Sequence, residues 1–415
     1  MYVTWPLSLY LKFTEAALIP PPEGPNSGHL VVADEESEAE AMCCWGLCKD
    51  NKIQNLPFPQ NKILRVRYTQ QHGESLTVHS DKAYNRQHGE SLTVHSDKAY
   101  TQQHGESPTV HSDKVYFIPV LNQPLSSNRY YVIRASGKYK GKACICSKDD
   151  IVTYCFCMCI NDVKPKALDH RDMYHQVEII RRHSGRFIAK SVASDGLPPL
   201  FLRRKGWEIY TKTPRDFQLG EARGVDLSLR ARLPTFDFPI SNKHSTSIVV
   251  GKWYIPFMFI KEVGTRSKYQ MKKSMFYEMY LEQMWDEIHM CENHGTEQNA
   301  VVVNATVRRE TATVTGQEAI TRVVDGMMWL SGPPSVGLSI AVVNRMKWEA
   351  CRGGWVDGKE RDLKVERVEE FGGVNGWRKF GCYMLVERFV LRRMDGSLVL
   401  TYDFNHTHLI QSKWE

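Results

Sequence analysis

The cysteines are the side chains of this chain most able to do chemistry, because thiolates bind metals and act as nucleophiles. Eight of the eleven fall in three clusters, namely Cys43, Cys44 and Cys48, then Cys144 and Cys146, then Cys155, Cys157 and Cys159. Cys44 and Cys48 have the spacing of a zinc knuckle, but we find no second knuckle of that kind after them. Cys155, Cys157 and Cys159 alternate, so a single strand would place them on one face, where reduced cysteines pack as small hydrophobic residues. The pattern favours buried thiols, and we expect no metal site and no cofactor.

An acidic stripe is the second candidate for metal chemistry. Glu278, Glu282 and Asp286 recur at every fourth position, and His289 follows three residues later. Carboxylate-x-x-His on a helix binds metals in bundles, but such a site needs ligands from several helices. We interpret the stripe as the solvated face of an amphipathic helix.

Basic residues interleaved with aromatic residues form the third candidate. Between Arg134 and Arg232 there are 20 basic and 11 acidic residues, a local charge of 20 − 11 = +9, whereas residues 1–60 carry 3 − 8 = −5. Such a segment suits anionic ligands or protein interfaces. The predicted contact residues are Tyr130, Tyr131, Lys138, Lys140, Lys142, Arg203, Arg204, Lys205 and Trp207.

No catalytic residue can be assigned from a motif. The chain contains no G-x-S-x-G, G-x-G-x-x-G or H-E-x-x-H pattern, and the segment from Gly137 to Ala143 has the wrong spacing for a phosphate-binding P-loop. A cysteine and histidine that meet only in the folded protein stay open as an alternative.

A tandem repeat of period 16 runs from Tyr68 to Val115 in three nearly identical copies. Each copy has too few apolar residues to build a core, so we expect an expanded loop between the strand-like segments Ile63–Tyr68 and Val115–Val120. The six histidines of the repeat, of fifteen in the chain, could hold a metal loosely, but duplication of a loop multiplies its histidines without any such role.

The elements that must position these residues are mostly short strands. Strands are expected at His29–Ala33, Tyr130–Ala135, Val152–Ile160, Gln176–Ile180, Arg186–Val192, Ile248–Ile260 and Met327–Leu330, with hairpins at Ala300–Thr315 and around Asp395-Gly396. Helical spacing predicts helices over Tyr269–Glu292 and Val336–Ala350, and a shorter one over Pro6–Phe13.

The predicted fold class is α+β and strand-dominated, with two packed β-rich halves, one long amphipathic helix and a C-terminal β-hairpin or meander. The predicted domains are residues 1–212, which contain the repeat at 68–115, and residues 247–415, joined by a linker at 213–246.

The composition is that of a soluble globular protein, with 42% hydrophobic and 24% charged residues. The N-terminal segment lacks a cationic start and is interrupted by Pro6, so no signal peptide is predicted, and no window is apolar enough for a membrane span. We therefore expect reduced cysteines and a cytoplasmic or nuclear protein.

Several long segments together resemble one family. They are MYVTWPLSLYL, PPPEGPNSGHLVV (20–32), LPFPQNK (56–62), FIPVLNQPLSSNRYYVI (117–133), residues 137–143, AKSVASDGLPPLFLRRKGWE (189–208), residues 250–259, residues 271–279 and DGSLVLTYDF (395–404). These segments are similar to a plant-specific family catalogued as domain of unknown function (DUF) 1262. The resemblance implies a soluble plant protein without an assigned reaction, cofactor or catalytic residue. The three-copy repeat departs from the family pattern.

The leading hypothesis is a non-enzymatic intracellular binding or regulatory module, whose partner is a protein or an anionic ligand. One alternative is an enzyme with a Cys/His pocket between its two halves. Another is a nucleic-acid or anionic-ligand binder that uses the basic region 134–232. The absence of a recognisable nucleic-acid module and a pI of 8.7 weigh against nucleic acid.

Overall fold

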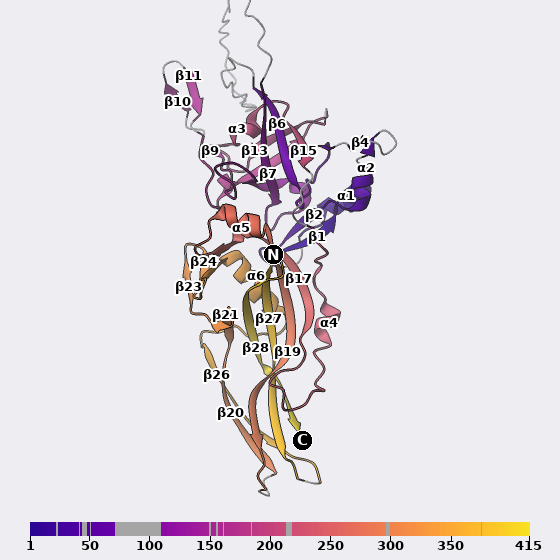
Figure 1. Ribbon diagram of the computed structural model, residues 1–415, viewed down its shortest axis with the longest axis vertical. Helices are drawn as coiled ribbons and strands as arrows, with labels where there is room; N and C mark the ends of the chain where they lie inside the picture. The colour runs from indigo at the N-terminus through magenta and orange to yellow at the C-terminus, as the bar shows by residue number, and fades with distance from the viewer. Residues whose placement is uncertain are drawn as a thin grey trace, which may run out of the picture.

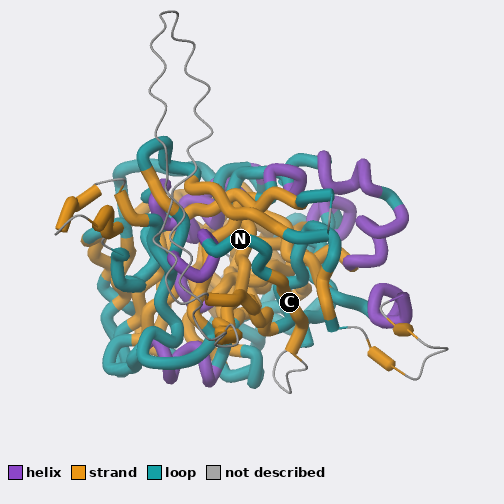
Figure 2. Tube along the Cα trace, turned by 90° about the horizontal axis from the view of Figure 1, so that it is seen from above, coloured by secondary structure: helices purple, strands orange, loops and turns teal. Residues whose placement is uncertain are grey.

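The computed structural model describes residues 1–21, 24–40, 42–43, 48–49, 51–70, 109–148, 151–154, 157–160, 162–183, 185–212, 218–295, 299–374 and 376–415. The molecule is elongated, with a seven-stranded sheet in its upper part and the long strands of a nine-stranded sheet below (Figure 1). Seen from above, strands fill its middle (Figure 2). The predicted β-rich character is confirmed.

The nine-stranded sheet is built on three long antiparallel neighbours. Its order is β2 (Gly28–Val32), β1 (Tyr2–Pro6), β17 (Ile248–Pro256), β19 (Phe276–Glu292), β27 (Lys379–Arg393), β28 (Leu398–Trp414), β21 (Glu310–Val314) and β22 (Gln317–Glu318), with β16 (Gly224–Val225) paired to β17. β27 and β28 form the predicted C-terminal hairpin, and Gly396 in its turn has φ +81°, a conformation that glycine adopts without strain.

The seven-stranded sheet carries the repeat. Its order is β13 (Phe187–Ser191), β12 (Gln176–Arg181), β8 (Arg129–Arg134), β7 (Thr109–Pro119), β6 (Ile63–Gln70), β15 (Glu208–Lys212) and β5 (Lys52–Ile53). The predicted hairpin is confirmed, because β6 and β7 pair antiparallel with Leu64 opposite Val115 and Gln70 opposite Thr109. Residues 71–108 of the repeat lie outside the described residues.

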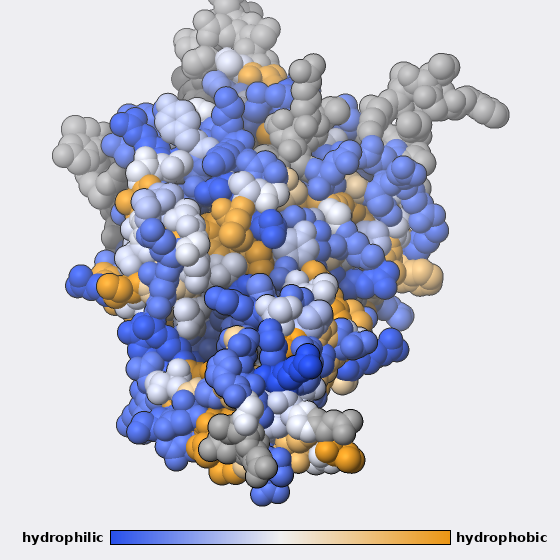
Figure 3. Space-filling model, turned by 60° about the horizontal axis from the view of Figure 1, so that its bottom comes forward, coloured by the Kyte–Doolittle hydropathy of each residue, from blue (hydrophilic) through white to orange (hydrophobic). Residues whose placement is uncertain are grey.

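Smaller sheets and short helices complete the described part. A four-stranded sheet has the order β18 (Ile260–Glu262), β25 (Val336–Ser339), β24 (Met327–Leu330) and β23 (Thr321–Val324). The two-stranded sheets are β20 (Ala300–Arg308) with β26 (Asp362–Glu370), β10 (Ile151–Tyr154) with β11 (Cys157–Ile160), β9 (Ser147–Lys148) with β14 (Gly196–Leu197), and β3 (Met42–Cys43) with β4 (Cys48–Lys49). The helices are α1 (Leu7–Lys12), α2 (Glu35–Glu40), α3 (Leu200–Arg203), α4 (Leu227–Ala231), α5 (Ser267–Lys273) and α6 (Ile340–Arg352). Apolar side chains at the lower end of the molecule form separate patches within a hydrophilic surface (Figure 3).

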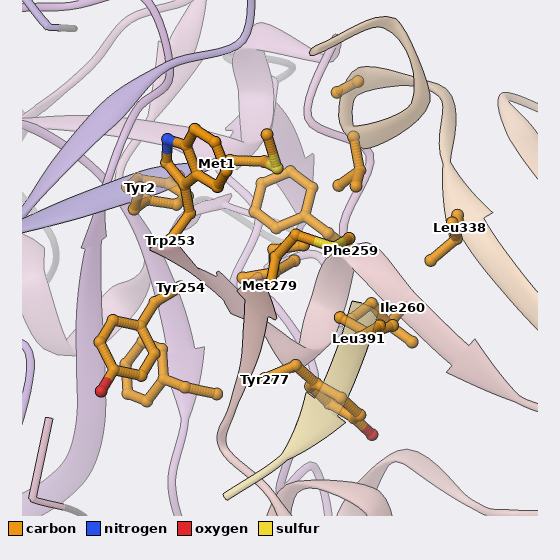
Figure 4. Packing of buried hydrophobic residues seen from close by; sticks show 14 of the residues in the cluster. Met1, Tyr2, Trp253, Tyr254, Phe259, Ile260, Tyr277, Met279, Leu338 and Leu391 are labelled. Atoms are coloured by element: carbon orange, nitrogen blue, oxygen red, sulfur yellow. The ribbon is translucent and has the colours of Figure 1, made fainter. Parts of the chain in front are cut away.

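One hydrophobic core joins segments from both ends of the chain. Met1 and Tyr2 pack with Trp253 and Met279, and the same cluster continues to Leu391 of β27 (Figure 4). A second cluster lies against the seven-stranded sheet and is centred on Phe58, Phe117, Tyr130, Phe187 and Trp207. The first cluster therefore ties β1 and β2 to the long strands, while the second one holds the upper sheet together.

The expectation of one long amphipathic helix over Tyr269–Glu292 is wrong. Residues 267–273 form the short helix α5, and residues 276–292 form the 17-residue strand β19. Along β19, Met279 and Leu281 point into the main core, while Met284 lies on the opposite face, in a separate cluster with Val307 of β20. Because the buried face changes along the strand, the apolar positions imitate a helical period, whereas the Tyr, Phe, Trp and Ile content favours a strand.

Three further expectations need correction. Val336–Ser339 is strand β25, so α6 begins only after Ser339, whose side chain accepts from the Ala341 amide. β20 and β21 do not form a hairpin, because β20 pairs with β26 and β21 pairs with β28. Val152–Ile160 holds two paired strands, β10 and β11, where one was expected. In the first two cases pairing with a distant segment overrides the local pattern, whereas β10 and β11 pair with each other.

The predicted packing of two β-rich halves is wrong at the N terminus. β1 runs parallel to β2 and pairs with β17 at Tyr2 and Tyr254, so the first 32 residues share a sheet with strands after residue 247. The domain bounds 1–212 and 247–415 stay a prediction.

Buried charges join the long strands to two helices. Arg230 of α4 donates from Nε to Glu387 Oε1 at 2.7 Å and from Nη1 to Glu349 Oε1 at 3.0 Å, and Glu349 of α6 also accepts from Arg345. His406 Nε2 lies 3.2 Å from Glu387 Oε2, without the alignment of a full hydrogen bond. Burial by itself would raise the pKa of Glu387, but its contacts with His406 and Arg230 outweigh burial and lower that pKa to about 2.

We expect Arg230→Met to lower the free energy of unfolding by about 3–5 kcal/mol, because it leaves two buried carboxylates without their shared cation. Arg223→Met, which removes an exposed pair with Glu221, is the matched control and should leave the urea midpoint unchanged. Urea denaturation followed by circular dichroism measures both variants. Equal midpoints for the two variants would contradict a stabilising role for the network.

Deleting residues 71–102 should leave the fold intact and raise its stability slightly. The deletion joins Gln70 to Gln103, keeps every residue of β6 and β7, and shortens the 38 undescribed residues between them by 32, to six. Shorter loop closure is worth roughly 1–2 kcal/mol. Deleting Tyr84–Val115 is the control, because it puts Ala83 in place of the fully buried Val115 and should cost roughly 1–3 kcal/mol. Thermal unfolding measures both variants. If the two deletions lower the melting temperature equally, the repeat units pack against the rest of the protein.

Candidate anion-binding site

Alternation along β6 and β15 divides their side chains between the core and the surface. Leu64, Val66 and Ile209 are fully buried in the upper core, while Arg65 and Arg67 point outward and are exposed. Successive side chains of a strand lie on opposite faces, so this arrangement follows directly from the local sequence. The outward face of the sheet is basic at its β6–β15 end.

A groove of about 670 Å³ lies on this face. It is lined by Asn51, Arg65, Arg67, Val110, Ser112, Tyr210, Thr211 and Lys212. Ser112 stands directly opposite Arg67 in the β6–β7 register, and its small side chain leaves the space beside the guanidinium unfilled.

Four cations lie in or beside this groove. Lys114 stands opposite Arg65 in the β6–β7 register, and Lys212 lies beside it. The positive charge of Lys212 lowers the pKa of Lys114, and burial and Arg65 act in the same direction. Within the described part of the chain, Arg65, Arg67, Lys114 and Lys212 form no ion pair with a carboxylate. These four residues are called the cationic cluster below.

One described carboxylate, Glu208, stands directly opposite Arg67 in the β6–β15 register and is already occupied. Glu208 accepts from Lys52 Nζ at 2.7 Å and from the Tyr210 hydroxyl at 2.6 Å, and these two hydrogen bonds lower its pKa. With the cationic cluster, Lys52 and Glu208 give a local charge of 5 − 1 = +4. Among the described residues the groove is therefore net positive, and Glu208, already bound to Lys52 and Tyr210, does not neutralise the cluster.

The groove is suited to binding an anion rather than to nucleophilic catalysis. The hydrogen bond to Glu208 raises the pKa of Tyr210, so its hydroxyl stays protonated at neutral pH. Two arginine guanidinium groups and two lysine ammonium groups offer donors that match phosphate, sulfate or carboxylate oxygens.

The predicted aromatic contact residues are part of the core. Tyr130 and Trp207 belong to the upper cluster, where Trp207 stacks on Phe187 at 5.5 Å between ring centroids. Tyr131 is buried in the main cluster, and its hydroxyl donates to the His170 carbonyl. None of the three exposes its ring to solvent, so these rings are not accessible to a ligand or partner at the surface.

The predicted basic contact residues lie in two places. Lys138, Lys140 and Lys142 are in the loop that follows β8, with Lys138 and Lys142 exposed. Arg203 ends α3 and pairs with Asp162 at 2.5 Å, Arg204 is half-buried, and Lys205 is exposed. Contact by these residues stays a prediction.

Of the clustered cysteines, Cys144 and Cys146 are the two whose side chains the structure describes. The described residues contain no group of three or more potential metal ligands. Cys144 and Cys146 are buried, and burial raises the pKa of Cys144 to about 12 and that of Cys146 to about 11. Cys44 and Cys155 lie outside the described residues, as do all histidines of the repeat except His111.

The acidic stripe belongs to strand β19 rather than to a helix. Glu278 pairs with Lys252 at 2.7 Å, and Glu282 stands opposite Arg388 of β27. Burial raises the pKa of Asp286, and His289 follows a β-bulge. The stripe is thus part of a cross-strand arrangement of opposite charges.

Sequence reasoning missed the cationic cluster because it looked for an excess of charge within one stretch of chain. Arg65 and Arg67 precede the repeat, Lys114 lies in its third copy, and Lys212 comes almost 100 residues later. The signal available was the alternation in ILRVRY, which places both arginines on the polar face of a strand.

The fold and groove define a strand-dominated protein with a positively charged surface groove. The family model described as "Protein of unknown function (DUF1262)" matches residues 23–156, or 134 of the 415 residues, a span that contains Arg65, Arg67 and Lys114. The match supports a relationship to a family of unknown function. No curated protein matches the chain.

Among solved structures, one titled "Crystal structure of Cry35Ab1" is similar to this chain at 11% identity and a TM-score of 0.42, covering 73% of this chain and 80% of that one. This similarity is too low to support an argument. Within the described ranges, every helix is too short or too polar to cross a bilayer.

Thiol labelling tests whether a reactive cysteine exists. We expect maleimide to modify exposed Cys351 in the native protein about tenfold or more faster than buried Cys144, Cys146 and Cys382, because burial keeps those three as neutral thiols. Peptide mass spectrometry gives each rate, with the urea-unfolded chain as the control. Rapid native labelling of Cys144 or Cys146 would contradict this and favour a catalytic thiol.

Proposed function

We propose that this chain is a non-enzymatic binding module for a small phosphate-bearing anion, which it holds in the groove between β7, β6 and β15. The observation that carries the proposal is the cationic cluster, in which Lys114 faces Arg65 and lies beside Lys212 with no ion pair to a described carboxylate. Placing like charges together costs free energy in the empty groove, and an anion recovers that cost on binding. Regulation of a partner by the bound state is part of the same proposal.

The size and chemistry of the groove support a compact ligand. A volume of about 670 Å³ lies within the range of roughly 300–1,000 Å³ that is typical of small-molecule sites. Arginine binds phosphate through two parallel hydrogen bonds, and Asn51, Ser112 and Thr211 add neutral hydrogen-bonding groups around Arg65 and Arg67.

Nucleic acid is less well supported as the ligand. Sequence-tolerant binding of single strands needs aromatic rings that stack on bases. The rings expected for that purpose, Tyr130, Tyr131 and Trp207, are buried, and Tyr210 is hydrogen-bonded to Glu208.

A plant cell's cytoplasm or nucleus is the proposed compartment. The support comes from the free thiols of the five cysteines whose side chains are described, Cys144, Cys146, Cys291, Cys351 and Cys382. Reduced cysteines of this kind are usual in reducing compartments.

Isothermal titration calorimetry with inorganic pyrophosphate at low salt tests the proposal. We expect binding by the wild-type chain, and a loss of about tenfold in affinity for Arg67→Met and for Lys212→Met, since a charge-assisted hydrogen bond contributes roughly 1.5–3 kcal/mol. The control is Lys359→Met, which removes an exposed positive charge outside the groove. Equal affinities for all variants, or no heat of binding with the wild type, would refute the proposal.

The affinity for sulfate should fall as the pH rises. Because Lys212 lowers the pKa of Lys114 in the empty groove, a bound anion raises that pKa, and binding is coupled to protonation of Lys114. Sulfate therefore binds with full affinity at pH values below the lowered pKa of Lys114, and its affinity falls as the pH rises through that pKa. Titrations from about pH 7 to about pH 10, near the ordinary lysine value, should show this slope, and Lys114→Met should remove it. If the affinity of Lys114→Met for sulfate still falls with rising pH, a group other than Lys114 takes up the proton.

A further inference from the structure

A second basic surface forms where the loop after β8 meets helix α5. Gly141 of this loop has φ +81°, and a Cβ built on it would lie 2.9 Å from the backbone carbonyl carbon and oxygen of Ser267. Only glycine permits so close an approach in this conformation. The contact joins two segments that are 126 residues apart in the sequence, since 267 − 141 = 126. α5 lies at the side of the molecule, between β9 and β24 (Figure 1).

Basic residues flank the contact on both sides. Lys140 and Lys142 adjoin Gly141, and Arg266 and Lys268 adjoin Ser267. Lys138 at the start of the loop and Lys272 in the last turn of α5 extend the surface. These six residues are called the α5 patch.

The α5 patch is not neutralised by described acidic residues. None of its six side chains forms an ion pair within the described ranges. Lys273 lies near two acids: it adds to the hydrogen bonds from Arg393 and Tyr277 that outweigh burial and lower the pKa of Glu262, and to the Ser397 hydrogen bonds that lower the pKa of Asp395. Glu262 is already paired with Arg393 at 2.8 Å, so we leave Lys273 out of the patch.

Aromatic and apolar side chains lie among these cations. Tyr269 of α5 is 55% exposed, and Lys268 Nζ lies 4.7 Å from its ring centroid. Val263, just before α5, is 50% exposed. Tyr139 lies between Lys138 and Lys142, with its ring centroid 5.8 and 5.9 Å from their Nζ atoms.

We infer that the α5 patch docks on an anionic lipid surface. Five of its six cations are lysines, which act as hydrated point charges and attract a charged surface without selecting one bound geometry. The exposed Tyr269 ring and the Val263 side chain supply the apolar contacts that a bilayer interface accepts. An oligonucleotide would instead favour arginine forks and stacked rings.

This inference does not depend on the groove. The cationic cluster lies on β6, β7 and β15, whereas the α5 patch is made by the β8 loop and α5, and no residue is shared. The two surfaces can therefore be tested separately in the full-length chain.

Co-sedimentation with vesicles tests the inference. We expect the full chain to sediment with phosphatidylcholine vesicles that contain roughly 30% phosphatidylserine, but not with pure phosphatidylcholine, and to be released as salt rises from about 0.05 to about 0.5 M. Lys138→Gln combined with Lys268→Gln should weaken vesicle binding about 25-fold, or about fivefold for each lysine. Tyr269→Ser should weaken binding to vesicles while leaving binding to soluble heparin unchanged.

Two controls separate the α5 patch from other causes. Lys359→Gln with Lys364→Gln removes the same charge from exposed residues elsewhere and should keep wild-type vesicle binding, as should the groove variant Lys212→Met. Thermal unfolding confirms that each variant is folded. Three results would overturn the inference: no binding of the wild type to the anionic vesicles, equal losses in the patch variant and its control, or a patch that binds a single-stranded oligonucleotide while ignoring the vesicles.

Discussion

The antiparallel ladder of β19, β27 and β28 carries large apolar side chains on different faces along its length, and the other elements are placed by the need to bury them. At its upper end, Met279 and Leu391 face the main core, which also takes in Tyr2 and Trp253. Lower down, the face that carries Met284 is covered by the β20–β26 pair, while Trp285 and Leu385 are covered by the segment around Phe236 and Phe238. A strand of 15 or 17 residues exposes more apolar surface than one layer can bury, so segments from the whole chain are drawn onto it.

Buried charges then fix how the helices sit on this ladder. The five-residue helix α4 is too short to be stable alone, but Arg230 binds it to Glu387 of β27 and to Glu349 of α6. Hydrophobic packing is non-directional, whereas these ion pairs are satisfied only in one arrangement. A second buried pair, Glu262 with Arg393, joins β18 to the end of β27 in the same way. Orientation in this fold thus depends on a few polar contacts within a large apolar core.

Both basic surfaces lie where a sheet or loop leaves this core. On β7, Tyr116 and Ile118 reach the main cluster while Phe117 reaches the upper one, so both faces are covered. Before Val115 no described cluster covers that outer face, and Lys114 and Ser112 stand opposite the two arginines of β6. The loop after β8 behaves similarly, because it leaves the sheet and brings Gly141, which two lysines flank, against Ser267 of α5. Both basic surfaces therefore lie at the margins of the packed layers.

The sequence by itself determined the strand-dominated class, the C-terminal hairpin, the β6–β7 hairpin around the repeat and the positive character of Lys138–Lys142, because each depends on neighbours in the chain. Tertiary structure decided the rest. Whether residues 276–292 formed a helix or a strand depended on which distant segments buried Met284 and Leu281, since the same apolar positions suit either period. The pairing of β20 with β26 rather than β21, and the burial of Tyr130 and Trp207, likewise required contacts that no local pattern encodes. The cationic cluster joins Arg65, Lys114 and Lys212 across almost 150 residues, and only the register of three strands brings those charges together.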